Sequence, residues 1–182
     1  MMTPYAACRR LLLAALLLVL AVPATAADLE GLLGELDTRN FRTKLQVAER
    51  IADSGHPRAL PVLQALGAGD LYIAGPEGRV VIRKGDDRVV DALTGDPVSV
   101  AGELDKVVVN ILMRRQIGTA VARLSLGAES AETRLSAARE LFGELDNTLE
   151  PVVRQRLETE SDTRVRAALQ TALAIAALQQ GS

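Results

Sequence analysis

Residues 133–138 read TRLSAA and residues 163–168 read TRVRAA, and this recurring motif decides the fold. A related stretch, TKLQVA, lies at residues 43–48. Apolar side chains in and after each copy recur at the spacing of one helical face. The next helix is also similar, because Pro61-Val62 follows the first copy as Pro151-Val152 follows the second. The sequence therefore predicts helical units that are repeated along the chain.

Two-helix units at a short period are typical of an α-solenoid, in which each repeat buries its apolar face on a neighbour. We therefore expect a mainly α fold of HEAT-like helical-hairpin repeats with a small antiparallel β insert. An ordinary helical bundle with chance similarity between its helices is the alternative. The expected divisions are N-terminal helical hairpins at 27–69, the β insert at 70–104, and a long helix plus HEAT-like repeats at 105–182.

The N-terminal hairpins occupy residues 27–69 in this division. Asp28 is expected to cap a short first helix, because an aspartate side chain accepts hydrogen bonds from free helical N–H groups. A stronger apolar period starts after Asn40, and Ser54-Gly55-His56-Pro57 ends it. A further helix follows, and the glycines up to Gly69 end it.

The β insert is predicted from a change of character after residue 70. Short apolar segments rich in β-branched residues alternate with turns rich in Gly and Asp, as in antiparallel hairpins. The segments are residues 71–73, 79–82 and 89–90, and the turns are residues 75–78 and 85–87.

The start of the long helix is ambiguous. Residues 106–111 can begin a helix or add a strand, because Val107-Val108-Val109 has strand propensity. From Val109 onward, one apolar stripe at helical spacing favours the helix. Its members are Val109, Met113, Ile117, Ala120 and Leu124.

Residues 1–26 have the organisation of a secretory signal peptide. Arg9-Arg10 forms the basic region, Leu11–Val22 the apolar region, and Ala24-Thr25-Ala26 the small-residue cleavage site. A bilayer-spanning helix needs about 20 apolar residues, so this run favours a cleaved signal, with a retained anchor as the alternative. The mature chain is expected to begin near Ala27 and to work outside the cytoplasm.

Composition excludes several classes of function. Removing Arg9 and Arg10 leaves 19 basic residues (21 minus 2) against 23 acidic ones, a net charge of −4. This balance provides no electrostatic footprint for nucleic acid or anionic lipid. The single cysteine, Cys8, lies in the signal, which excludes disulfides and thiolate chemistry in the mature chain. No cofactor is expected.

The candidate catalytic and metal-binding residues have structural explanations. His56 is the only histidine and stands in a turn between two helices, so neither a catalytic triad nor a histidine-based zinc site can be assembled. Asp86-Asp87, Asp91 and Asp96 suggest calcium, but their spacing fits no EF-hand loop and favours solvated turns. We expect no enzyme activity.

Asn110, Arg114 and Arg115 are the candidate interface residues. Arg114 follows Asn110 by one helical turn, and Arg115 is its neighbour on the predicted long helix. These residues can form a docking surface for an acidic partner. The alternative is the solvated face of an amphipathic helix.

Five segments, taken in their order along the chain, form a pattern that is more specific to one protein family than amino-acid composition is. They are residues 54–63, 70–72, 79–82, 91–95 and 104–115. This order resembles the N-terminal extracytoplasmic region of the urea ABC transporter permease, a subunit related to branched-chain amino acid permeases. The resemblance covers most of the chain. It implies a periplasmic place at the outer face of the inner membrane, with the transmembrane permease or the substrate-binding protein as partner.

The chain departs from that family in two ways. Asn110 matches the family motif, but Ile111 and Leu112 stand where the family usually has polar residues. The family also continues into a multi-helix permease, whereas no segment after the signal is long and apolar enough to cross a bilayer. The resemblance therefore implies a truncated permease, an isolated domain or the product of a split gene, which does not conduct urea by itself.

Three hypotheses of function follow. The first is a non-catalytic periplasmic docking or structural module of a urea-type ABC import system. The second is a free-standing periplasmic helical-repeat scaffold that binds a protein or peptide. The third is a small-molecule binder that holds its ligand between the β insert and the helices.

Overall fold

The computed structural model describes residues 25–85, 88–100 and 102–180. Within them the fold is mostly helical with one small antiparallel sheet, as the sequence predicts. Apart from its last two residues, the predicted signal peptide lies outside the described residues. The helices are α2 (Thr25–Glu35), α3 (Phe41–Asp53), α4 (Ala59–Ala68), α5 (Ile111–Leu126), α6 (Ala131–Glu140), α7 (Glu150–Thr159) and α8 (Thr163–Gln180). The strands are β1 (Leu71–Ala74), β2 (Arg79–Lys84), β3 (Arg88–Asp91) and β4 (Leu104–Lys106).

Helix α2 begins earlier than expected. It starts at Thr25, so the prediction that Asp28 caps it is wrong. Alanine has the highest helix propensity, and Ala26 and Ala27 extend the helix toward the N-terminus. The stripe that α2 buries consists of Leu29, Leu32 and Leu33, which are joined by Leu36 just after its end.

Helix α3 starts and stops where its sequence predicts. The Asn40 side chain accepts hydrogen bonds from the backbone N–H of Arg42 (2.9 Å) and of Thr43 (3.2 Å). These bonds satisfy two of the N–H groups that have no partner within the helix. Ser54 ends α3, and α4 ends at Gly69, whose φ of +80° closes the helix in a left-handed conformation.

The β insert is a four-stranded antiparallel sheet in the order β3-β2-β1-β4. The predicted first three strands are confirmed. Strand β4 pairs with β1 through residues 104–106, so the sheet extends two residues past the residue 104 at which the β insert was expected to end. Of residues 106–111, for which the sequence left helix and strand open, only Lys106 belongs to β4 and only Ile111 belongs to α5.

Helix α5 begins later than the apolar stripe predicts. Asn110 is its N-cap, and its side-chain oxygen accepts a hydrogen bond from the Met113 N–H at 2.8 Å. Val109 therefore precedes the helix, although it still packs against the core. Asparagine favours the extended N-cap conformation, which explains why the helix starts after it.

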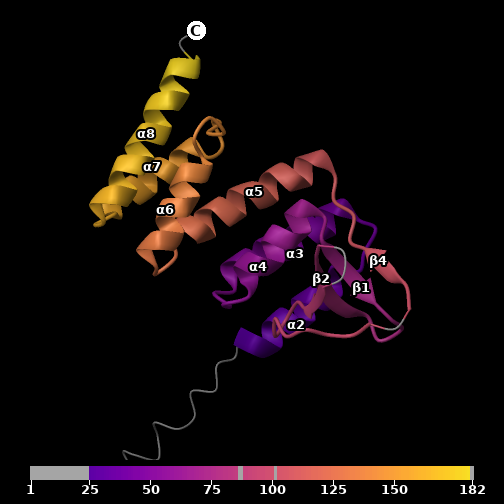
Figure 1. The fold of residues 1–182 in the computed structure, drawn as a ribbon. Helices are drawn as coiled ribbons and strands as arrows, with labels where there is room; N and C mark the ends of the chain where they lie inside the picture. The colour runs from indigo at the N-terminus through magenta and orange to yellow at the C-terminus, as the bar shows by residue number, and fades with distance from the viewer. Residues whose placement is uncertain (1–24, 86–87, 101, 181–182) are drawn as a thin grey trace, which may run out of the picture.

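Two apolar cores are connected by α5. Met113 and Ile117 pack into the first core, together with α2, α3, α4 and the sheet. Leu126, at the other end of α5, packs into the second core with α6, α7 and α8. Figure 1 shows α5 running from the side of β4 toward α6. Among the described residues, no helix combines the length and the apolar character that crossing a bilayer requires.

A buried ion-pair network stabilises the second core. Glu160, between α7 and α8, accepts two hydrogen bonds from the Arg134 guanidinium at 2.7 and 2.9 Å. Arg156 adds a bond of 2.8 Å to the same carboxylate, and the Asp162 N–H adds another of 2.8 Å. The Glu160 side chain is fully buried. The network thus joins α6, α7 and the start of α8.

Candidate functional site

Helices α3 and α5 run in the same direction, with their N-termini at the same end of the molecule. Near that end, the Lys44 ammonium donates a hydrogen bond to the Val108 carbonyl at 2.9 Å. Near the opposite end, the Arg123 guanidinium forms an ion pair with Asp53 at 2.7 Å. Figure 1 shows both helices starting on the side of β4. The two N-termini are therefore brought together by tertiary packing.

Exposed apolar side chains gather at this end. Phe41 is 41% exposed, Val108 56%, Ile111 87% and Leu112 66%. We name these four residues the α3/α5 surface. Within the described part of the chain, only two other large apolar residues are exposed, Phe142 and Leu178. Apolar residues that gather on a surface among polar neighbours mark an interaction site more often than scattered ones do.

The predicted interface residues lie beside this surface. Arg115 follows Ile111 by four positions and Leu112 by three, so it shares their face of α5. Arg114 follows Ile111 by three positions. Both arginines are exposed, and neither forms an ion pair with another described residue. Two guanidinium groups are thus available next to exposed apolar side chains.

Asn110 has a local structural function. Its side-chain oxygen is engaged by the Met113 N–H, so it caps α5. Phe41 was not predicted because it is distant from α5 in the chain. Val108 lies two residues before the α5 cap, but it was considered only for its strand propensity. The sequence did carry a signal that Ile111 and Leu112 are exposed, because they lie off the apolar stripe that Met113 and Ile117 define.

A cavity of about 570 Å³ opens next to the α3/α5 surface, between the start of α3 and β4. Its charged lining residues are of both signs: Asp37, Arg39, Lys44, Asp105 and Lys106. Lys44 is buried, and this burial lowers the pKa of its ammonium group, although the charge of Asp37 opposes the shift. The ammonium also lies 5.8 Å from the centre of the Phe41 ring, at the distance of a cation–π contact. The cavity thus extends the surface toward the sheet.

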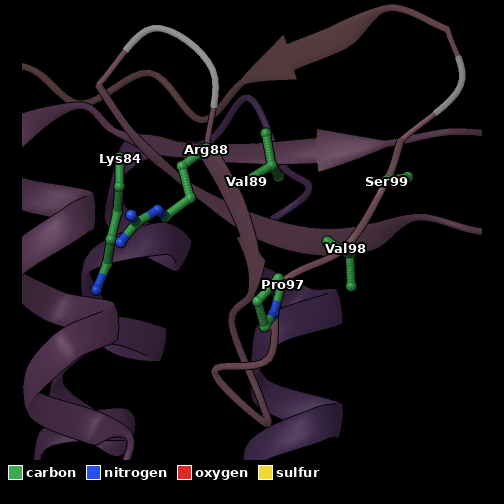
Figure 2. A pocket seen from close by; sticks show the side chains of 6 residues that line it. All are labelled: Lys84, Arg88, Val89, Pro97, Val98 and Ser99. Carbon is green, nitrogen blue, oxygen red and sulfur yellow. The ribbon is translucent and has the colours of Figure 1, made fainter.

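A second cavity, of about 530 Å³, lies beside the β2–β3 hairpin. Figure 2 shows its lining, in which Lys84 and Arg88 extend side by side. These two cations are cross-strand partners, an arrangement that is unfavourable without a compensating charge. Asp86 and Asp87, which connect them in the sequence, lie outside the described residues. The cavity is therefore not a complete candidate site.

Of the remaining candidate residues, His56 lies between α3 and α4, and Asp91 ends β3 just before a turn. The His56 ring nitrogen Nδ1 accepts a hydrogen bond from the Arg58 N–H at 3.0 Å. Asp91 accepts from the N–H groups of Leu93 and Thr94, as in a capped turn. The part of the chain that the structure describes holds no group of three His, Cys, Asp or Glu side chains arranged to bind a metal ion.

Comparison of this chain with protein-family models, with curated proteins and with solved structures finds no match.

Proposed function

We propose that this chain is a non-catalytic periplasmic module of a urea-type ABC import system, which docks on the substrate-binding protein or on the transmembrane permease. The α3/α5 surface is the observation that carries the proposal. Its four apolar side chains are exposed next to two arginines that have no ion-pair partner among the described residues. Buried aromatic and arginine side chains commonly contribute most of the binding energy at a protein interface.

The resemblance to the urea permease supports this choice of partner. The resembling segments include residues 104–115, which supply three of the four residues of the α3/α5 surface. In this chain the motif has Ile111 and Leu112 in place of the family's usual polar residues. An apolar pair at this position favours a protein contact over a polar ligand.

We also propose that α3–α4 and α6–α7 are two copies of one HEAT-like hairpin, and that α8 opens a third. Asn40 and Ser130 cap the first helix of each copy through their side chains. Lys44 and Arg134 occupy the same position after the cap, and both are buried and bind backbone carbonyl groups. The variant Lys44→Arg, which places the second copy's residue in the first, should then fold with a Tm close to that of the parent. A large loss of Tm would count against equivalent copies.

Binding of purified components tests the docking role. The chain is immobilised, and the purified urea-type substrate-binding protein and the nanodisc-embedded permease are each passed over it. Ile111→Glu with Leu112→Glu should weaken binding at least about tenfold, because it places charge in a contact that is buried on association. Leu178→Glu is the matched control, since Leu178 is an exposed leucine (74%) on α8. It should leave the affinity unchanged.

Two outcomes would contradict the proposal. Failure of both importer components to bind would remove the import system as partner. If the α3/α5 surface then bound another purified periplasmic protein, the free-standing scaffold would be the better description. Equal weakening by the Leu178 control would show that the α3/α5 surface is not the site of docking.

A further inference from the structure

We infer that the segment docking on the α3/α5 surface is a protein segment that carries carboxylate side chains next to apolar ones. This inference rests on the proposed docking role and adds the chemistry of the partner.

Helices α3 and α5 are parallel, so their N-termini lie at one end of the molecule. Each helix carries a positive partial charge at its N-terminus, and here the two positive ends lie together. The caps Asn40 and Asn110 engage only some of the first N–H groups. Because the effect of a helix dipole is confined to its first turn, the positive potential is concentrated where Phe41 and Ile111 are exposed.

Four arginines lie at or beside the N-terminal ends of these two helices. Arg39 and Arg42 flank the start of α3, and Arg114 and Arg115 lie in the first two turns of α5. All four are exposed, and none has an ion-pair partner among the described residues. Elsewhere in the described chain, Arg50, Arg123, Arg154 and Arg164 are exposed and paired with carboxylates. Arg88 and Arg139 are also exposed without an ion-pair partner among the described residues, but the N-terminal ends of α3 and α5 together carry four such arginines.

Positive charge and exposed apolar area are combined on one face of α5. Arg115 lies on the same face of α5 as Ile111 and Leu112, so one partner segment can reach all three. A guanidinium binds a carboxylate through two parallel hydrogen bonds, which gives such a contact direction as well as strength. The matching segment has an acidic residue flanked by apolar ones.

A protein segment fits this surface better than an anionic membrane does. The adjoining cavity exposes Asp37 and Asp105 as well as cations. A continuous anionic surface would bring negative charge against these carboxylates, whereas a discrete segment can place its acids on the arginines alone. The cavity can also accept a side chain that protrudes from such a segment.

Selection from a random-peptide library displayed on phage tests the inference, with the full chain as bait. The enriched peptides should contain Asp or Glu next to apolar residues, and fluorescence polarisation with the synthesised peptides measures their affinity. Arg114→Glu with Arg115→Glu should weaken binding at least about tenfold. Raising the salt from about 0.05 M to about 0.5 M should also weaken it, because the Debye length shortens. The matched control, Lys84→Glu with Arg88→Glu, reverses two exposed cations on the β2–β3 hairpin and should change the affinity less than about twofold.

Enrichment of neutral or basic peptides, or equal binding to the Arg114/Arg115 variant, would overturn the inference. Co-sedimentation with phosphatidylglycerol vesicles that depends on Ile111 and Leu112, without acidic peptide enrichment, would assign the surface to a lipid headgroup layer instead. The two proposals fail separately. If importer components bind and the Arg114/Arg115 variant binds them as well as the parent does, docking stands and the acidic partner is refuted. If acidic peptides bind and importer components do not, only the import system is refuted.

Discussion

Replacing Glu160 with glutamine tests the buried network that joins α6, α7 and α8. The carboxylate accepts two hydrogen bonds from Arg134 and further bonds from Arg156 and the Asp162 N–H. Glutamine keeps the size of the side chain but removes its charge and one acceptor. Two guanidinium groups then lose their common anion inside the second core.

The size of the effect follows from burial. Removing one partner of a buried ion pair costs about 3–5 kcal/mol, because the remaining charge is left desolvated and unpaired. The Glu160 side chain has no exposed area and that of Arg134 is 9% exposed, so the pair is buried. Arg156 is 24% exposed and can turn to water, and glutamine retains one oxygen acceptor. We therefore expect a loss of about 3 kcal/mol in the free energy of unfolding.

Urea denaturation followed by circular dichroism at the helical band measures this loss, because the chain has no Trp for fluorescence. Glu132→Gln is the matched control. Glu132 also accepts a 2.7 Å hydrogen bond from an arginine, Arg164, but its side chain is 72% exposed. Its replacement should leave the urea midpoint within experimental error of the parent, because exposed pairs contribute little.

The pH dependence gives a second readout. Hydrogen bonds from Arg134, aided by those from the Asp162 N–H and Arg156, hold the pKa of Glu160 well below its ordinary value of 4.5. A carboxyl group whose pKa is lowered by folding stabilises the protein fully above its unfolded pKa. That stabilisation is lost as the pH falls toward the folded pKa. The difference in free energy of unfolding between the parent and Glu160→Gln should therefore have its full size at neutral pH and become smaller as the pH falls below 4.5. A midpoint equal to that of Glu132→Gln, or a difference that does not change with pH, would refute the reasoning.

Substitutions at four further positions test local backbone features and core packing, each by urea denaturation. Asn110→Ala should cost about 1 kcal/mol by removing the cap of α5, and Asn110→Asp, which keeps the acceptor, should restore most of it; equal losses would argue against capping. Gly95→Ala should cost about 1 kcal/mol or more, because Gly95 has a φ of +85° and a Cβ there would lie 2.9 Å from the Arg58 guanidinium. Gly118→Ala, inside α5 with open space around it, should instead stabilise by about 0.5–1 kcal/mol. Leu66→Ala should cost about 2–5 kcal/mol, because Leu66 is fully buried in the first core; a loss below about 1 kcal/mol would contradict that packing.

Much of the fold could be predicted from local sequence because its signals are local. Asn40 and Gly69 act within one turn of their own helices, so the bounds of α3 and α4 could be anticipated. Gly75 and Gly78 adopt positive φ in the turn between β1 and β2, as the glycine pattern indicated. Errors arose where the local signal was weak, as at the starts of α2 and α5.

The candidate site was only partly predictable. Arg114 and Arg115 are adjacent on one helix, so a helical reading places them together. Phe41 is distant from them in the sequence and joins them only because α3 and α5 pack in parallel. The departure of Ile111 and Leu112 from the buried stripe was the one sequence signal of an exposed apolar surface.

Local sequence and composition sufficed for the helical periodicity, the end of α3 at Ser54, the turns of the β insert and the lack of cysteine after residue 8. Each of these depends on residues that are near one another in the chain or on composition alone. Tertiary structure decided three other features: that Lys44 and Arg134 are buried, that Glu160 collects two guanidinium groups, and that two helix N-termini meet beside exposed apolar side chains. The physical reason is that burial and charge pairing depend on which distant segments are in contact, and those contacts form only when the two cores pack around α5.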